Sequence, residues 1–356
     1  MKQVKIKIII ALTLPIQLFL VHFLSKKPQW IAHYYSNGIY PYISKTLRLI
    51  LGWIPFSVGD ILGLVLLFLM IKACYSLIKN NFKNSISKFL QFTGILSLLY
   101  FCFYAFWGLN YFREPLAENL GLKQANYSTE QLIETTQKII FELNKTHLDI
   151  THNDTIKVTV PHTRKQIYGL ATNGYKQLEK QYPQLKYQFP SIKSSVVSLF
   201  QSYNGTGGYI NPITGEAQIN DLLPKTGYPA TTCHEMAHQI GWAAENDANF
   251  VGFLAAISNE DMYFKYSGYR MAYTYCIKQV YKRDKNSAKK LRNTVNKGIY
   301  KDYNDSYLHW QQFKNPIEPY FKKGYNAYLK ANNQVNGIKS YSYVVDLLIA
   351  YFTQKK

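Results

Sequence analysis

Three apolar stretches in the first third of the chain restrict its fold more than any other feature of the sequence. They run from about Ile6 to Leu24, from about Asp60 to Ile78 and from about Ile86 to Leu109. Each is close to the ~20 residues that a helix needs to cross a bilayer. Trp107 and Tyr111 lie at the end of the third stretch, where an interfacial aromatic belt is expected. The sequence therefore predicts three transmembrane helices and a lipid bilayer as a partner.

The basic residues around these stretches predict how the chain crosses the membrane. Three lysines lie before or at the start of the first stretch and three more lie between the second stretch and the start of the third, and they are Lys2, Lys5, Lys7, Lys79, Lys83 and Lys88. Because positive loops stay in the cytoplasm, we expect both segments inside and everything after about Arg113 outside. The residues after the first stretch, "VHFLSKKPQW", offer no small-x-small cleavage site, so an uncleaved anchor is favoured over a signal peptide.

Composition supports this division of the chain. The 41 Lys and Arg residues exceed the 21 Asp and Glu residues, which gives a formal charge of +20. With no aromatic-basic pattern and no run of five like charges, this excess favours anionic lipid over nucleic acid. The segment "ISKTLRLILGWIPF" alternates basic and apolar residues at helical spacing, which is typical of an interfacial helix. We predict a membrane domain over residues 1–112 and a second domain over residues 113–356.

The second domain is predicted to be mostly α with a small β element, an α+β fold. Helical periods with capping signals recur in "YSTEQLIETTQKIIFELNK" and "HTRKQIYGLATNGYKQLEKQY", and later in "MYFKYSGYRMAYTYCIKQVYK". "SSVVSLF" and "GEAQIN" are short strand candidates separated by the glycine-rich turn "NGTGGYINPITG". The final run "YSYVVDLLIAYF" is predicted to be a packed core helix, because it is too short for a fourth span.

Four cysteines are too few for a disulfide scaffold. Cys74 and Cys102 lie in apolar stretches and are predicted to be packing residues. A Cys233–Cys276 disulfide and two unpaired thiols both remain open, since sequence does not fix pairing.

The motif "HEMAH" carries the clearest chemistry. On a helix, His234 and His238 project from one face one turn apart, so both imidazoles can reach one Zn²⁺ ion. Glu235 lies beside them and could act as general base toward a water molecule on the metal. The alternative is that the histidines are ordinary helix residues, although the pattern arises by chance in only roughly half a percent of such sequences.

A third metal ligand is expected downstream, and Glu245 is the preferred candidate. In an unbroken helix Glu245 would lie about 10 Å along the axis from His238, so the chain must turn back. Gly241 stands where a left-handed residue would permit that turn. Asp247 is the rival ligand, but it points to the opposite side of the new helix, whereas Asn249 could support a ligand from behind.

The strand candidate before the motif has two interpretations. "GEAQIN" could be an edge strand that binds extended substrate by strand addition, or an ordinary hairpin strand. Glu216 in this segment is predicted to be solvated rather than to touch substrate.

Five segments resemble the domain of unknown function 3810 family, a group of bacterial membrane proteins that look like zinc metallopeptidases. They are "WIPFSVGD", "FWGLNYFREPL", "GGYINPITGEAQIN", "CHEMAHQIGWAAENDANF" and "GIKSYSYVVDLL", and the similar region runs from about Ile43 to Phe352. The resemblance implies a zincin-like domain in which His234, His238 and Glu245 bind zinc and Glu235 is the catalytic base. In the family pattern two acids follow the glutamate closely. Here those two positions are Asn246 and Asp247, which departs from the pattern, whereas the motif E-x-x-A-N is retained from Glu245 to Asn249.

The sequence thus predicts a zinc-dependent peptidase in the bacterial inner membrane, multi-pass, with its C-terminal domain outside the cytoplasm and a protein or peptide substrate. Two alternatives come from other classes: a zinc-binding membrane sensor or assembly protein without hydrolytic activity, and a structural protein with a metal-stabilised but inert domain. The connection after the second stretch is too short to be the effector segment that a receptor needs.

Overall fold

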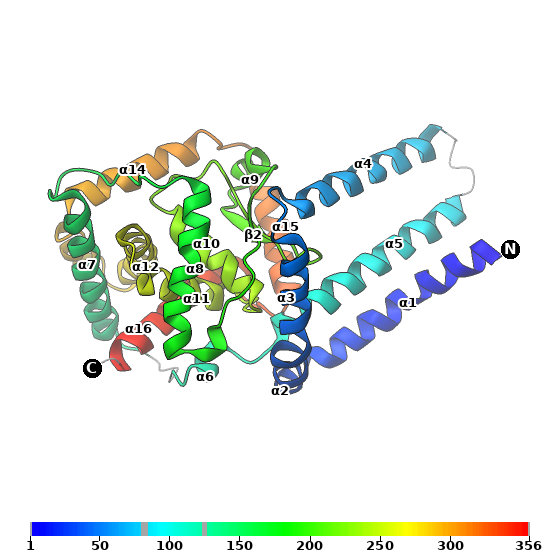
Figure 1. Ribbon diagram of the computed structural model, residues 1–356, viewed down its shortest axis with the longest axis horizontal. Coiled ribbons are helices and arrows are strands. Elements are labelled where there is room, and N and C mark those ends of the chain that lie inside the picture. Colours follow the sequence, from blue (N-terminus) through cyan, green and yellow to red (C-terminus); the bar gives the residue numbers. More distant parts are fainter. Residues whose placement is uncertain (1, 80–84, 123–126, 355–356) are drawn as a thin grey trace.

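The computed structural model describes residues 2–79, 85–122 and 127–354, and these are mostly helical with one small sheet. Three long apolar helices lie side by side on one side of the molecule, and the remaining elements pack together on the other (Figure 1). The expected α+β composition is confirmed. Lys83, one of the lysines used to predict orientation, lies outside the described residues.

The three apolar helices are α1 (Lys2–Ser25), α4 (Val58–Lys79) and α5 (Ser85–Phe106). Each is long and apolar enough to cross a membrane. α1 packs along α5, where the Thr13 hydroxyl lies 2.8 Å from the Ser97 hydroxyl and Gln17 donates to the same oxygen over 3.0 Å. These bonds satisfy polar groups within an otherwise apolar bundle.

A second group of elements connects α1 to α4. It consists of α2 (Pro28–Trp30), the π-helix η1 (Ile31–Ile39) and α3 (Tyr40–Leu51). On α3 the buried side chains are polar, namely Tyr40, Ser44 and Arg48, whereas Leu49 and Ile50 are exposed. An exposed apolar face on a helix beside the spans fits the interfacial position that its sequence predicts.

The sheet has the strand order β1-β3-β2, with β1 (Ile192–Ser194) parallel and β2 (Gly208–Ile210) antiparallel to β3 (Ala217–Ile219). The expected strand in "GEAQIN" is confirmed, but β3 is the central strand, so the edge-strand interpretation of this segment is wrong. The free edge near the histidine helix belongs to β2, which lies inside the segment predicted to be only a turn.

The strand predicted over "SSVVSLF" is also wrong, because β1 ends at its first residue and a helix, α9 (Ser198–Asn204), follows. The Asp60 carboxylate accepts bonds from the Ser195 hydroxyl over 2.9 Å and the Val196 N–H over 2.8 Å. These bonds from the start of α4 turn the backbone out of the sheet, despite the strand propensity of the two valines.

Helices form the core of the region predicted to be the second domain. Its main members are α7 (Thr129–Thr151), α8 (Arg164–Gln181), α10 (Tyr228–Gln239), α11 (Glu245–Ser258), α12 (Met262–Arg283) and α16 (Val344–Gln354). α7 and α8 both begin with capping boxes, at Ser128 with Gln131 and at Thr163 with Gln166. α16 is largely buried, which confirms the expected core helix.

Smaller elements complete the chain. They are η2 (Gly108–Phe112), α6 (Leu116–Asn119), η3 (Pro183–Leu185), α13 (Lys285–Asn293), α14 (Lys297–Gln311), α15 (Glu318–Ala331) and η4 (Gly337–Tyr343). Cys233 and Cys276 are both buried as free thiols, so the structure contains no Cys233–Cys276 disulfide.

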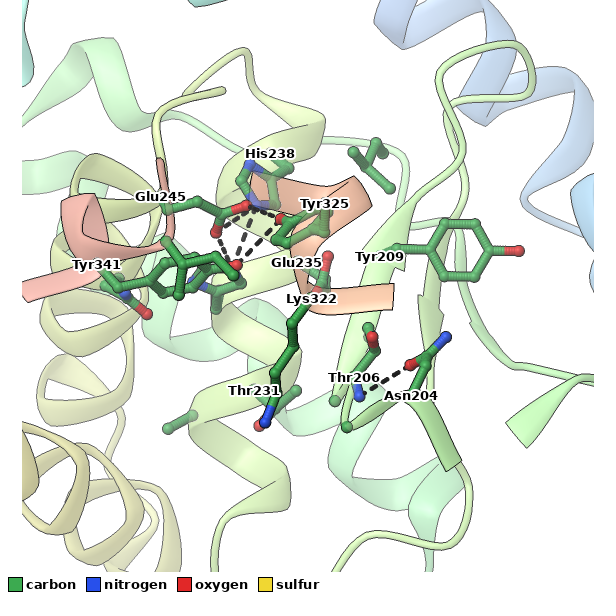
Figure 2. A pocket seen from close by; sticks show the side chains of 18 of the residues that line it. Asn204, Thr206, Tyr209, Thr231, Glu235, His238, Glu245, Lys322, Tyr325 and Tyr341 are labelled. Atoms are coloured by element: carbon green, nitrogen blue, oxygen red, sulfur yellow. Dashed lines mark hydrogen bonds and ion pairs between the residues drawn. The ribbon is translucent and has the colours of Figure 1, made fainter. Parts of the chain in front are cut away.

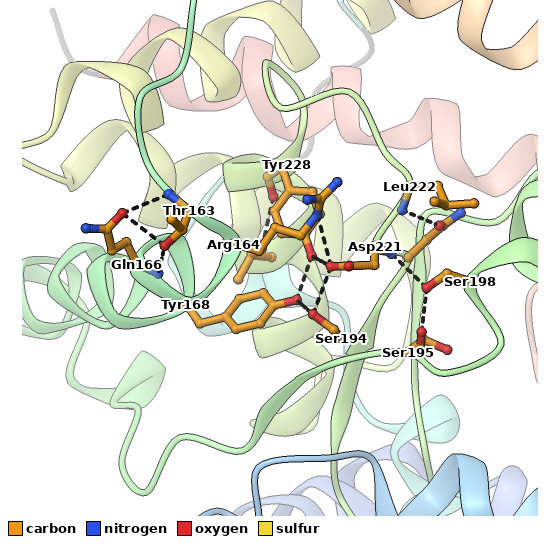
Figure 3. A network of polar contacts seen from close by, with 12 residues as sticks. Thr163, Arg164, Gln166, Tyr168, Ser194, Ser195, Ser198, Asp221, Leu222 and Tyr228 are labelled. Carbon is orange, nitrogen blue, oxygen red and sulfur yellow. Dashed lines mark hydrogen bonds and ion pairs between the residues drawn. The ribbon is translucent and has the colours of Figure 1, made fainter.

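A polar network fixes the start of α10 (Figure 3). The Tyr168 hydroxyl of α8 contacts the hydroxyls of Tyr228 and Ser194. Ser194 donates to Asp221 over 2.8 Å, and Arg164 pairs with the same carboxylate oxygen at 3.0 Å. The network joins α8, the sheet and the first turn of α10, which positions the helix that carries the histidines.

A buried carboxylate joins the sheet to the first turn of α4. Glu216 is fully buried, and accepts bonds from the N–H groups of Val58 at 3.1 Å and Gly59 at 2.6 Å and from the Thr214 hydroxyl at 2.9 Å. A negative charge is favourable at a helix N-terminus, where N–H groups lack intrahelical partners. The prediction that Glu216 is solvated is therefore wrong.

We expect Glu216→Ala to lower the stability of the chain by about 2–3 kcal/mol, because it leaves buried N–H groups without an acceptor. The midpoint of thermal unfolding in detergent measures this, with Glu134→Ala as the control at an exposed position on α7. Equal midpoints for the two variants would show that the carboxylate does not hold α4 to the sheet.

Candidate metal centre

The two histidines of the motif lie one turn apart on α10, as their spacing predicts. The Nδ1 atom of His238 lies 2.7 Å from the Trp242 carbonyl oxygen, an acceptor, so this nitrogen carries the proton. In the neutral imidazole the Nε2 atom then carries the lone pair, and it faces the Nε2 atom of His234 at 3.1 Å. Two imidazole nitrogens thus converge on one point, with the tautomer that a metal ligand requires fixed at His238.

The turn after α10 brings the predicted third residue back to the histidines. Gly241 has a φ of +91°, which favours glycine, and an added Cβ would lie 2.9 Å from the Tyr40 ring. α11 then begins at Glu245. The Oε2 atom of Glu245 lies 3.3 Å from His234 Nε2 and 3.6 Å from His238 Nε2. The predicted turn and the predicted return of Glu245 are both confirmed.

These three atoms have the spacing that a tetrahedral ion needs. Bonds of 2.0–2.1 Å, as zinc makes to nitrogen and oxygen, place neighbouring ligand atoms about 3.3 Å apart. The observed separations of 3.1, 3.3 and 3.6 Å lie around that value. Glu245 Oε2 is buried and has no hydrogen-bond donor among the described residues. The residues therefore fit a divalent cation with imidazole and carboxylate ligands.

Glu245 is held from its other side by tyrosines. Its Oε1 atom accepts a hydrogen bond from the Tyr325 hydroxyl at 2.7 Å, and Tyr325 lies 3.1 Å from the Tyr341 hydroxyl. Burial favours the neutral acid, but the facing imidazoles of His234 and His238 outweigh it and hold the pKa of Glu245 well below its usual range. Burial likewise lowers the pKa of His238, yet the Glu245 carboxylate raises it to about 8. The cluster therefore stabilises a charged carboxylate.

Glu235 lies beside the two histidines. Ligand atoms of Glu235, His234 and His238 all lie within 4.8 Å of one another, so Glu235 is close enough to contact a group bound by the histidines. Strand β2 passes close to it, because a Cβ on Gly208 would lie 2.8 Å from the Oε1 atom of Glu235. Burial raises the pKa of Glu235, and its Oε2 atom has no partner within the described residues. These properties suit a base more than a ligand.

Asp247, the alternative ligand, and Asn249, the expected supporting residue, both bind groups outside the cluster. Asp247 accepts a bond from the Leu116 N–H at 3.3 Å, and burial raises its pKa to about 7. It therefore faces away from the histidines, as its helix position predicts. Asn249 donates to the Tyr275 hydroxyl at 3.2 Å, and no bond from it to a histidine or to Glu245 is present in the described part of the chain.

The end of α10 is held by residues that sequence reasoning missed. The Gln239 carbonyl accepts bonds from Tyr40 at 2.9 Å and Ser44 at 2.6 Å, both on α3. The His238 carbonyl accepts a bond from the Trp107 indole at 3.0 Å, and Arg113 donates to the Gly241 carbonyl at 3.1 Å. These bonds satisfy carbonyls that a helix end leaves free, so elements next to the spans position the histidines.

The cluster opens into a cavity of about 1070 Å³. Its walls come from the end of α5 with η2, from β2, and from α10, α12, α15 and η4. Figure 2 shows Glu245, His238 and Tyr325 converging at one side of it, with Glu235 and Lys322 nearby and the Tyr209 side chain extending away. Tyrosines are frequent in the lining, yet nothing in a sequence with 31 of them singles out Tyr325.

One comparison with known proteins identifies the family that the sequence segments resemble. The model of the family described as "Protein of unknown function (DUF3810)" matches residues 35–349. No curated protein and no solved structure matches the chain. Since the family model covers most of the 356 residues, the chain belongs to the DUF3810 family.

Proposed function

We propose that this chain is a membrane-anchored, zinc-dependent hydrolase of peptide bonds, located in the bacterial inner membrane with its second domain outside the cytoplasm. The observation that carries the proposal is the set of three ligand atoms, His234 Nε2, His238 Nε2 and Glu245 Oε2, at separations of 3.1–3.6 Å. A buried acid, Glu235, next to this set is the arrangement that H-E-x-x-H hydrolases use.

His234, His238 and Glu245 would hold the ion, and zinc in such a site lowers the pKa of a water molecule and polarises a carbonyl group. Glu235 would accept the proton of the attacking water and pass it to the leaving amine. Its raised pKa brings the carboxylate closer to neutral pH, where a general base works best. Tyr325 fixes the Oε1 atom of Glu245, which leaves Oε2 directed at the histidines.

A peptide substrate is favoured by the edge of β2. This edge is unpaired in the described part of the chain, and the residues of β2 line the cavity. An extended peptide could add to it as a further strand, with its backbone N–H and C=O groups paired. Because Gly208 has no side chain, β2 itself runs close to Glu235, so a peptide paired with β2 would lie near this carboxylate.

The proposal predicts about one zinc ion per purified chain. His238→Ala should remove most of the zinc, because two remaining ligands bind the ion weakly. His309→Ala should keep it, since His309 lies on α14 and packs against Trp310 and Phe313. Elemental mass spectrometry of the detergent-purified chain measures both. If the two variants held equal amounts of zinc, the ligand assignment would be wrong.

Glu235→Gln should lower the rate of peptide hydrolysis by about 10²–10⁴-fold, because glutamine keeps the size of the side chain but cannot accept the proton. Zinc content and unfolding midpoint should stay at the parent values. Cleavage of a quenched peptide library measures the rate, with Glu134→Gln as the exposed control.

A Glu235→Gln variant that cleaved as fast as the parent would contradict the hydrolase. That result would instead favour a zinc-binding sensor or assembly protein, a function for which the direct bonds between α10 and the elements next to the spans also provide a physical route.

A further inference from the structure

Most side chains of helix α15 (Glu318–Ala331), which lies at the edge of the cavity, are exposed to solvent. Of its 14 residues, Leu329 is the one that is buried. Tyr325 and Tyr328 on one side of the helix line the cavity. Lys323, Ala327 and Lys330 do not line it and are exposed. Because only one of its side chains is buried, packing within the chain contributes little to the stability of α15. We therefore expect the exposed side of the helix to be covered by another surface.

The C-terminal end of α15 is tied to the end of α5. The hydroxyls of Tyr328 and Tyr111 lie 3.2 Å apart, and the Tyr328 ring packs against Phe103 with centroids 6.2 Å apart. Directly after the helix, Asn332 accepts a bond from the Tyr104 hydroxyl at 2.9 Å. Phe103 and Tyr104 belong to the last turn of an apolar, membrane-length helix.

The N-terminal end of α15 is tied, through α9, to the start of α4. Phe321 packs edge-on against Phe200 with centroids 5.4 Å apart, and Asn315 donates to the Tyr203 carbonyl at 2.7 Å. α9 follows Val196, whose N–H bonds to Asp60 in the first turn of α4. Figure 1 shows α9 beside the start of α4, with α15 next to it.

The contacts at its two ends determine the direction of α15 relative to the apolar helices. α4 and α5 are consecutive antiparallel helices, so the start of α4 and the end of α5 lie at the same end of the bundle (Figure 1). A helix that bridges these two points runs along the surface of a bilayer that the helices cross. α3, which presents Leu49 and Ile50 outward, lies at the same end.

The outer surface of α9 and α15 has the composition of an interfacial segment. Five apolar or aromatic side chains on or directly before these helices are more than half exposed, namely Val196, Leu199, Phe200, Ile317 and Tyr320, of which Tyr320 also reaches the cavity. The charged residues of α15 are Lys322, Lys323 and Lys330 with one acid, Glu318, which pairs with Lys322. Apolar side chains with flanking lysines match the acyl boundary and the anionic headgroups of a membrane.

We propose that these five residues with Lys323 and Lys330, hereafter the α9–α15 face, rest in the interfacial layer of the bilayer. α15 then forms the wall of the cavity on the membrane side, and the mouth of the cavity lies at the level of the membrane surface. If the cavity hydrolyses peptides, which rests on the function proposed above, its substrate class is a chain segment held close to the bilayer, such as the juxtamembrane part of an anchored protein.

Spin labels test the position of this face in the full-length chain. Nitroxides are attached at Leu199→Cys and Ile317→Cys, with Phe141→Cys as the control, since Phe141 is also more than half exposed but belongs to α7, on the side of the molecule away from the spans (Figure 1). Cys74 and Cys102 are first replaced by serine, because Cys233 and Cys276 are buried and stay unlabelled. The chain is placed singly in nanodiscs of phosphatidylethanolamine and phosphatidylglycerol.

We expect oxygen to relax the labels at Leu199 and Ile317 more strongly than a water-soluble nickel chelate does, with the reverse at Phe141. Stronger relaxation by the nickel chelate than by oxygen at all three sites would show that the face is in water. Labels at Leu199 and Ile317 shielded from both reagents would show that protein covers the face, and either result overturns the proposal. The readout is depth and not activity, so a failure here leaves the proposed hydrolysis untouched.

Discussion

The buried contact between Glu245 and the imidazoles of His234 and His238 is the interaction on which the candidate site depends. A carboxylate taken out of water costs several kcal/mol unless charges or donors compensate for it. Here two imidazoles and the Tyr325 hydroxyl face it, which holds its pKa well below the usual range. The contact exists only because the chain reverses at Gly241, so the candidate metal site depends directly on this turn.

Two buried junctions connect this site to the apolar helices. At one, the side chains of Tyr40, Ser44 and Trp107 bind the last carbonyls of α10. At the other, Glu216 and Asp60 join the sheet to the first turn of α4. A boundary between residues 112 and 113 divides the chain in sequence, but residues on both sides of it, such as Trp107 and Ala243, share one core cluster. The C-terminal end of α10, which carries His238, is therefore held in place by elements next to the spans.

Features that depend on local pattern could be predicted from the sequence. The spans follow from long apolar runs, the caps of α7 from Ser128 and Gln131, and the return of Glu245 from helix geometry and one glycine. Features that depend on contacts between distant residues could not. Val196 and Val197 favour a strand locally, but Asp60 binds the backbone there and a helix follows. For the same reason Glu216, whose partners lie at the start of α4, and Tyr325, whose partner is Glu245, had no signal in the sequence.

X-ray absorption at the zinc edge of the purified full-length chain tests the central claim most directly, because it reads the ligands rather than the activity. The account predicts four nitrogen and oxygen ligands at about 2.0–2.1 Å, with the outer-shell scattering of two imidazoles. A shell of sulfur near 2.3 Å, or one of oxygen without imidazole scattering, would contradict it, since zinc would then be bound by other groups than His234, His238 and Glu245.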